Sequence, residues 1–210
     1  MKKSLIMMYP IKEFVDTHPI YHDINSVGLY RWEKLFSDLL NLNQTAFRQR
    51  FRTLNRLRIN QYRKAGFEVN WVYFGREEDK SVPDERTHSE IFTVFPQDKK
   101  ISTGLAYIDL RNHIYPDSFE LIRKSGNPEK LVVGGFHESD CVARLACVSN
   151  SSTDIFLTER FFSEVLKTFN FDFDGKLVKE GKLNAEMHED IPAEEKRMTI
   201  EMILKHELKL

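Results

Sequence analysis

Cysteine is scarce in this sequence of 210 residues, which contains only Cys141 and Cys147. The two stand six residues apart in a stretch whose apolar spacing predicts a helix. Helical geometry separates and diverges two such side chains, so a disulfide between them is excluded. A chain without disulfides is typical of a reducing compartment, and we expect a cytoplasmic protein.

Long apolar runs and an excess of charge are also missing. No segment approaches the ~20 apolar residues of a membrane helix, and the apolar run at residues 4–9 is too short for a secretion signal. The 31 basic and 32 acidic residues nearly cancel, to a net charge of −1. A charge near zero gives no general attraction to nucleic acid or to a membrane surface, so we expect neither as a partner.

Alternation of helices and strands dominates the rest of the chain. The apolar run at 4–9 ends at Pro10 and predicts a central strand, because proline cannot continue a strand ladder. Residues 31–64 follow helical spacing, and a glycine then leads into the β-branched and aromatic strand 67–74. This unit is typical of an α/β fold with a mostly parallel sheet flanked by helices. We expect one α/β domain over residues 1–172 and a charged extension over 173–210 that ends in an amphipathic helix.

A break at residues 41–44 divides the helical stretch 31–64 in two. The second helix is rich in arginine, and residues 45–66 contain no acidic residue. This pattern predicts a basic surface helix, which either contacts an acidic partner or is a solvated face. The charged loop at 75–100 is either a lid or a partner-binding loop, or is simply exposed to solvent.

Residues 131–148, LVVGGFHESDCVARLACV, carry the main functional signal. Three apolar residues predict a buried strand, Gly134 and Gly135 permit a tight turn, and Ser139 or Asp140 caps the helix that follows. Cys141 then lies in the first helical turn, where unpaired N–H groups favour the nucleophilic thiolate. The alternative is that Cys141 is a buried apolar filler, the role we also expect for Cys147.

Two segments resemble the isochorismatase-like cysteine hydrolases. Gly135, Cys141 and Val142 match the strand, turn and helix that present the nucleophile in that family, although Glu138 and Ser139 replace its usual Thr-Asp. Residues 9–14 resemble the loop after the family's first strand. Tyr9 stands where the family has the aspartate that takes the proton from the cysteine, and a phenol with a pKa of about 10 is a poor base.

The resemblance implies a three-layer Rossmann-like α/β fold, a homo-oligomer, and hydrolysis of an amide-type small molecule by a cysteine nucleophile without a metal or a cofactor. It also implies that backbone N–H groups near residues 136–141 form an oxyanion hole. The expected catalytic residues are Cys141, His137, Glu138 and Asp16, where one of the last three replaces the missing aspartate. The expected substrate-binding residues are Tyr9, Phe14, Phe136 and Arg111, the last standing near the position of the family's lysine. The alternative is an inactive family member that binds a ligand or a protein.

Overall fold

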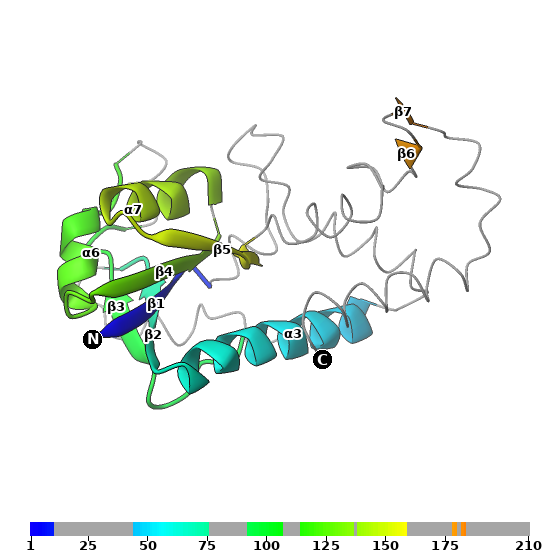
Figure 1. The fold of residues 1–210 in the computed structure, drawn as a ribbon, viewed down its shortest axis with the longest axis horizontal. Helices are drawn as coiled ribbons and strands as arrows, with labels where there is room; N and C mark the ends of the chain where they lie inside the picture. The colour runs from blue at the N-terminus through cyan, green and yellow to red at the C-terminus, as the bar shows by residue number, and fades with distance from the viewer. Residues whose placement is uncertain are drawn as a thin grey trace.

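The computed structural model describes residues 1–10, 44–75, 92–106, 114–136, 138–158, 178–179 and 182–183. Its elements are coloured by position in the chain in Figure 1. In chain order they are β1 (Lys3–Met8), α3 (Gln44–Lys64), β2 (Phe67–Tyr73), β3 (Lys99–Ser102), α6 (Ser118–Lys124), β4 (Lys130–Gly135), the π-helical turn η1 (Glu138–Val142), α7 (Ala143–Val148), β5 (Ser152–Thr158), β6 (Val178–Lys179) and β7 (Lys182–Leu183).

A five-stranded parallel sheet organises the described residues, in the order β3-β2-β1-β4-β5. Strand β1 is its centre, hydrogen-bonded to β2 on one side and to β4 on the other. Its apolar run is buried on both faces, as a parallel sheet covered by helices requires. The expected α/β class is therefore confirmed, and so is the central strand, which covers residues 3–8 instead of the expected 4–9.

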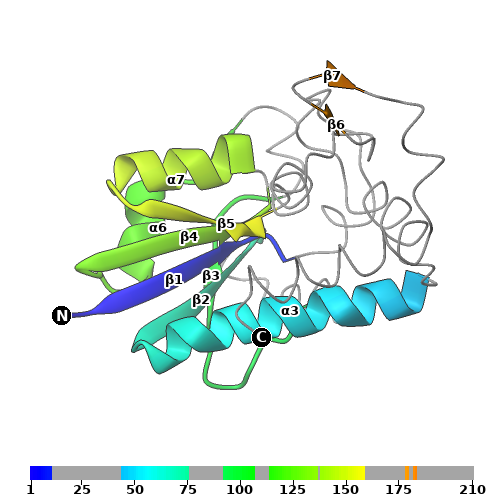
Figure 2. The same ribbon diagram turned by 45° about the vertical axis from the view of Figure 1, so that its right-hand side comes forward.

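Helices cover both faces of this sheet. Figure 2 shows α3 along one face and α6 and α7 over the other. The chain moves outward from β1 to β2 and β3, crosses back to β4 on the other side of β1, and moves outward again to β5. Because parallel crossovers are right-handed, this reversal puts the later helices on the opposite face. It also creates a switch point between the carboxyl ends of β1 and β4, where open α/β sheets bind their ligands.

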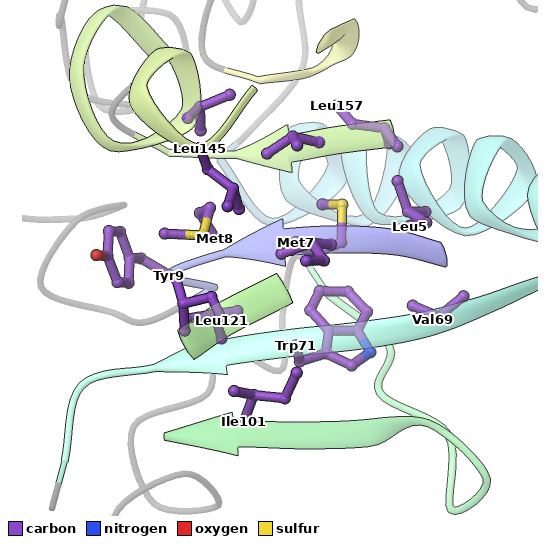
Figure 3. Close-up of a cluster of buried hydrophobic side chains, with 14 of the residues drawn as sticks. Leu5, Met7, Met8, Tyr9, Val69, Trp71, Ile101, Leu121, Leu145 and Leu157 are labelled. Carbon is purple, nitrogen blue, oxygen red and sulfur yellow. The ribbon is translucent and has the colours of Figure 1, made fainter. Parts of the chain in front are cut away.

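The core gathers around β1. Figure 3 shows Leu5, Met7 and Met8 surrounded by side chains from neighbouring strands and from α6 and α7. On the side of the sheet covered by α6, the hydroxyl of Ser4 donates to the backbone oxygen of Ser125 at the end of that helix, at 3.5 Å.

Helix α3 is the expected basic surface helix only in part, since Arg52 and Arg56 are exposed but two other arginines turn inward. The guanidinium of Arg58 donates to a carboxylate oxygen of Asp154 in β5 at 2.8 Å, and the hydroxyl of Tyr62 donates to the same oxygen at 2.6 Å. Burial lowers the pKa of Arg58, but the hydrogen bond and the charge of Asp154 outweigh it, so this pKa is raised. Burial and the same hydrogen bond raise the pKa of Tyr62 above its ordinary value.

A second buried carboxylate holds the last turn of α3. Asp98, directly before β3, accepts from Arg63 at 2.6 Å, from the indole of Trp71 at 2.9 Å, and from the backbone N–H of Phe95 at 3.0 Å. The guanidinium of Arg63 also lies over the ring of Phe95, with 4.5 Å between them. Both arginines therefore attach α3 to the sheet instead of facing solvent.

Several predicted boundaries are confirmed and others are corrected. Strand β2 is as expected, although it ends at Tyr73. The apolar residues at 101–110, with a kink at Gly104, predict a strand there. Strand β3 instead begins at Lys99 and ends at Ser102, because the chain turns at Gly104 with a φ of +76°.

The sequence also predicts Asp117 or Ser118 as the cap of a helix, and the Asp117 carboxylate does accept from two backbone N–H groups in the first turn of α6. Helical spacing predicts that Phe119 packs inward together with Leu121 and Ile122. Phe119 is instead exposed, because it lies on the outer side of α6.

The predicted boundary between residues 172 and 173 lies outside the described residues. Within the expected extension, β6 and β7 form an antiparallel pair that the sequence did not predict. Among the helices of the described ranges, none combines the length and the apolar character of a membrane span.

Candidate active site

The turn that ends β4 is built on a close backbone approach. Gly135 has a φ of +104°, and a Cβ placed on it would lie 2.2 Å from the backbone oxygen of Met8 in β1. The next N–H, of Phe136, donates to that same oxygen at 3.0 Å. Only glycine fits this position, because any side chain would push the two central strands apart. The predicted role of Gly135 in a tight turn is therefore confirmed.

Cys141 lies in the π-helical turn η1, which runs directly into α7. Its side chain is 4% exposed and belongs to the buried core. Single π turns are rare and occur frequently at functional sites, because they change the direction of the side chains that they carry. The expected position of Cys141 near the start of a helix is thus correct, with a π turn in place of a regular first turn.

The cap and the second cysteine differ from expectation. Helix α7 begins after Val142 without a side-chain cap, and the carboxylate of Asp140 binds Arg144 instead. Cys147 is exposed, whereas Leu145 and Ala146 point into the core. The two-residue step from Leu145 to Cys147 turns the sulfur to the opposite side of the helix.

Three side chains meet beside Cys141. The Nε of Arg144 donates to Asp140 at 2.7 Å, and its guanidinium lies 3.9 Å from the ring centre of Tyr115. The hydrogen bond to Asp140 is the main reason that the pKa of Arg144 is raised. Burial and then the charge of Asp140 raise the pKa of Tyr115, and Cys141 is close enough to add to this shift. We call Tyr115, Asp140 and Arg144 the clamp.

Tyr9 lies just beyond the end of β1, as Figure 3 shows. Its side chain is fully buried and stacks on Phe74, with 4.2 Å between ring centres and 12° between ring planes. Its φ of +53° is uncommon for a residue with a side chain, and such conformations cluster at functional sites. Its expected contact with a substrate stays a prediction.

Phe136 follows the glycine turn, at the same switch point. Its ring is buried and packs edge to face on Phe92 at 5.7 Å, and Phe92 packs on Trp71 at 5.8 Å. Because its N–H donates to Met8, this N–H already has an acceptor and is not an open oxyanion donor. The later N–H groups, at the start of η1, are the ones with no acceptor inside the helix.

Four of the expected site residues lie outside the described residues: His137, Asp16, Phe14 and Arg111. Glu138 begins η1, so its backbone lies three residues before Cys141, but its side chain also lies outside the described part. The expected roles of these residues therefore stay predictions.

The clamp was not predicted from the sequence. The i, i+4 spacing of Asp140 and Arg144 is a signal that could have indicated the ion pair. Tyr115 gave no such signal, because it lies 25 residues before Asp140 and reaches it only through the fold. Among the residues that the structure describes, no group of three or more His, Cys, Asp or Glu side chains is placed to hold a metal ion.

No protein-family model matches the sequence, and no curated protein matches it. Among solved structures, the chain is similar to the crystal structure of N-carbamoylsarcosine amidase from Thermoplasma acidophilum. The two chains are 13% identical, the match covers 86% of this chain and 97% of that one, and the TM-score is 0.42. The fold class rests on the parallel strand order of this chain, and the candidate site rests on its own side-chain contacts.

Proposed function

We propose that the chain is a cysteine hydrolase that acts on an amide-type small molecule, with Cys141 as the nucleophile. The observation that carries the proposal is the place of Cys141 in a π turn directly after β4, beside the end of β1. This is the switch point of the sheet, where ligands bind in α/β folds. The match of Gly135, Cys141 and Val142 to the isochorismatase-like pattern supports the same reading.

The proposed reaction has two steps. The thiolate of Cys141 attacks the carbonyl carbon, the C–N bond breaks, and the amine leaves with a proton. Water then attacks the resulting thioester, which releases the acid and restores the thiol. Backbone N–H groups at the start of η1 hold the oxyanion in both steps. His137, Glu138 and Asp16 are the candidates for the proton transfers, and Tyr9 is a poor candidate because it is a phenol packed on Phe74.

A second candidate is a non-catalytic protein of the same fold that binds a ligand or a protein. The burial of Cys141 and the stacking of Tyr9 favour it, because a nucleophile must reach its substrate and Tyr9 occupies the position of the family's base. The two candidates differ in one measurable property, the reactivity of the Cys141 thiol.

The test is the rate of alkylation of Cys141 by iodoacetamide as a function of pH in a Cys147→Ser variant. This background is essential because Cys147 is exposed and reacts on its own. With only two cysteines in the chain, the variant reports Cys141 alone. A hydrolase is expected to react with a half-maximal pH below about 7.5. A half-maximal pH of about 8.5 or above, or no reaction, leaves the binding protein as the better reading.

A direct assay completes the test. Ammonia release from a panel of small primary amides is measured for the parent protein and for a Cys141→Ala variant. A hydrolase loses this activity with the sulfur, and an adduct on Cys141 appears in the intact mass during turnover. Ammonia release that is equal in the two proteins would place any activity at another residue.

A further inference from the structure

The clamp connects two separate segments of the described chain around Cys141, the continuous stretch of η1 and α7 and the segment before α6. Asp140 belongs to η1, Arg144 to the first turn of α7, and Tyr115 to the segment before α6. Cys141 lies in sequence between the two charged members and directly follows Asp140. A movement of η1 relative to α7 or to Tyr115 therefore breaks the clamp.

The clamp is also poorly suited to a purely stabilising role. The side chains of Arg144 and Asp140 are 55% and 30% exposed. Ion pairs at such positions contribute little to the free energy of unfolding, because water screens them. The planar guanidinium, held at its Nε by a carboxylate and stacked on an aromatic ring, instead restricts the orientation of the turn between them.

We propose that Tyr115, Asp140 and Arg144 are positioning residues that hold η1 in the orientation in which the Cys141 sulfur meets a carbonyl carbon. This inference rests on the proposed function, because it assumes that Cys141 is the nucleophile. Attack on a carbonyl requires the sulfur and the oxyanion donors to be aligned together, whereas alkylation requires only an accessible thiolate. The ratio of the two rates therefore measures positioning.

The experiment compares acylation by p-nitrophenyl acetate with alkylation by iodoacetamide, both followed at Cys141 by mass spectrometry of the peptide that contains it, in the full chain with Cys147→Ser. Asp140→Asn and Arg144→Met are introduced singly and together. We expect each single variant to lower the ratio of acylation to alkylation about fivefold, since each breaks the same arrangement. The double variant is expected to lose no more than either single variant, because the two residues act as one unit.

A purely electrostatic role gives a different pattern. Asp140→Asn removes a negative charge next to the sulfur and favours the thiolate, whereas Arg144→Met removes a positive charge and disfavours it. Both reaction rates would then rise in the first variant and fall in the second, with the ratio unchanged. That pattern overturns the positioning role.

The chain provides a matched control and a matched pair of variants. Arg123 binds Glu120 on α6 with the same chemistry, at 2.6 Å, but that pair lies outside the clamp, so Arg123→Met should leave the ratio unchanged. Tyr115→Phe keeps the ring under Arg144 and removes only the hydroxyl that interacts with Asp140, so it should lower the ratio less than Tyr115→Ala, which should lower it as far as Arg144→Met does.

The experiment distinguishes a failure of the proposed hydrolase from a failure of the proposed positioning role of the clamp. A parent protein that is never acylated at Cys141 overturns both the hydrolase and the clamp. A parent that is acylated, with clamp variants of unchanged ratio and unchanged thermal midpoint, overturns the clamp alone and leaves the hydrolase standing.

Discussion

Arginine and aspartate meet on both sides of the sheet, but in two different settings. On the α3 side, the carboxylates of Asp154 and Asp98 are 3% and 2% exposed, and each accepts from several donors. Beside Cys141, Asp140 is only half-buried and Arg144 is exposed. The same pair of residue types therefore serves attachment of a helix in one place and, as we propose, orientation of a turn in the other.

The physical reason for the difference is the cost of removing a charge from water. A buried carboxylate must have its lone pairs filled by protein donors, so losing one partner leaves a large penalty. An exposed pair exchanges its partner for water at little cost. Variants on the two sides of the sheet should therefore differ sharply in stability.

The largest effect is expected at the turn after β4, and it comes from the backbone instead of an ion pair. Gly135→Ala should destabilise the protein by about 4 kcal/mol, because it adds a strained positive φ to a clash with Met8. Gly66→Ala is the control, since Gly66 has a φ of +83° and nothing within 4 Å. It should cost only about 1 kcal/mol by urea unfolding. Equal losses of unfolding free energy in the two variants would show that the close approach of Gly135 to Met8 makes no contribution of its own.

The next largest effect is expected at the buried carboxylate of Asp154. Asp154→Ala should lower the free energy of unfolding by about 3 kcal/mol, because it leaves the Arg58 guanidinium and the Tyr62 hydroxyl without their acceptor. Glu120→Ala, which removes an exposed carboxylate from an ion pair with Arg123, should leave the urea midpoint unchanged. A small loss for Asp154→Ala would mean that the bonds to Asp154 contribute little to holding α3 on the sheet.

A third effect depends on pH. Tyr62→Phe should cost about 1.5 kcal/mol at pH 7, the value of a hydrogen bond to a charged group. Because the folded state raises the pKa of Tyr62, its contribution is fully present below the unfolded value of about 10 and is lost as the pH rises further. The difference between the parent and Tyr62→Phe should therefore shrink above pH 10 in urea titrations. A constant difference from pH 7 to 11 would contradict this assignment.

The smallest effect on stability is expected at the exposed ion pair of Asp140 and Arg144. Asp140→Asn, which weakens the pair with Arg144, should leave the urea midpoint unchanged. Any effect of this variant on acylation of Cys141 is then separate from stability. A midpoint that falls as far as that of Asp154→Ala would mean that the clamp is structural.

Local patterns in the sequence were sufficient for several elements. The apolar run of β1, the β-branched residues of β2 and the Asp117 cap each depend on neighbours in sequence, and each is found as expected. The inward arginines of α3 were missed, because Arg58 and Arg63 reach carboxylates 96 and 35 residues away. No pattern within the helical segment distinguishes these two arginines from the exposed ones.

The candidate site also combines features that the sequence predicts with features that depend on tertiary contacts. The glycine turn and the place of Cys141 near a helix start follow from a strand, two glycines and a helical spacing within one short segment. The π turn, the burial of Cys141 and the stacking of Tyr9 on Phe74 depend on how β1, β2 and β4 pack together. No pattern within one segment contains that information.

The sequence by itself determined that the chain alternates helices and strands and that a glycine turn precedes a cysteine, because backbone preferences and apolar periodicity act over a few residues. Only the tertiary structure decided that β1 lies beside β4, that Gly135 must have no side chain, and that Tyr115 meets Arg144 next to Cys141. These contacts join residues far apart in the chain, and they form only when the parallel sheet brings the strand ends together at one edge.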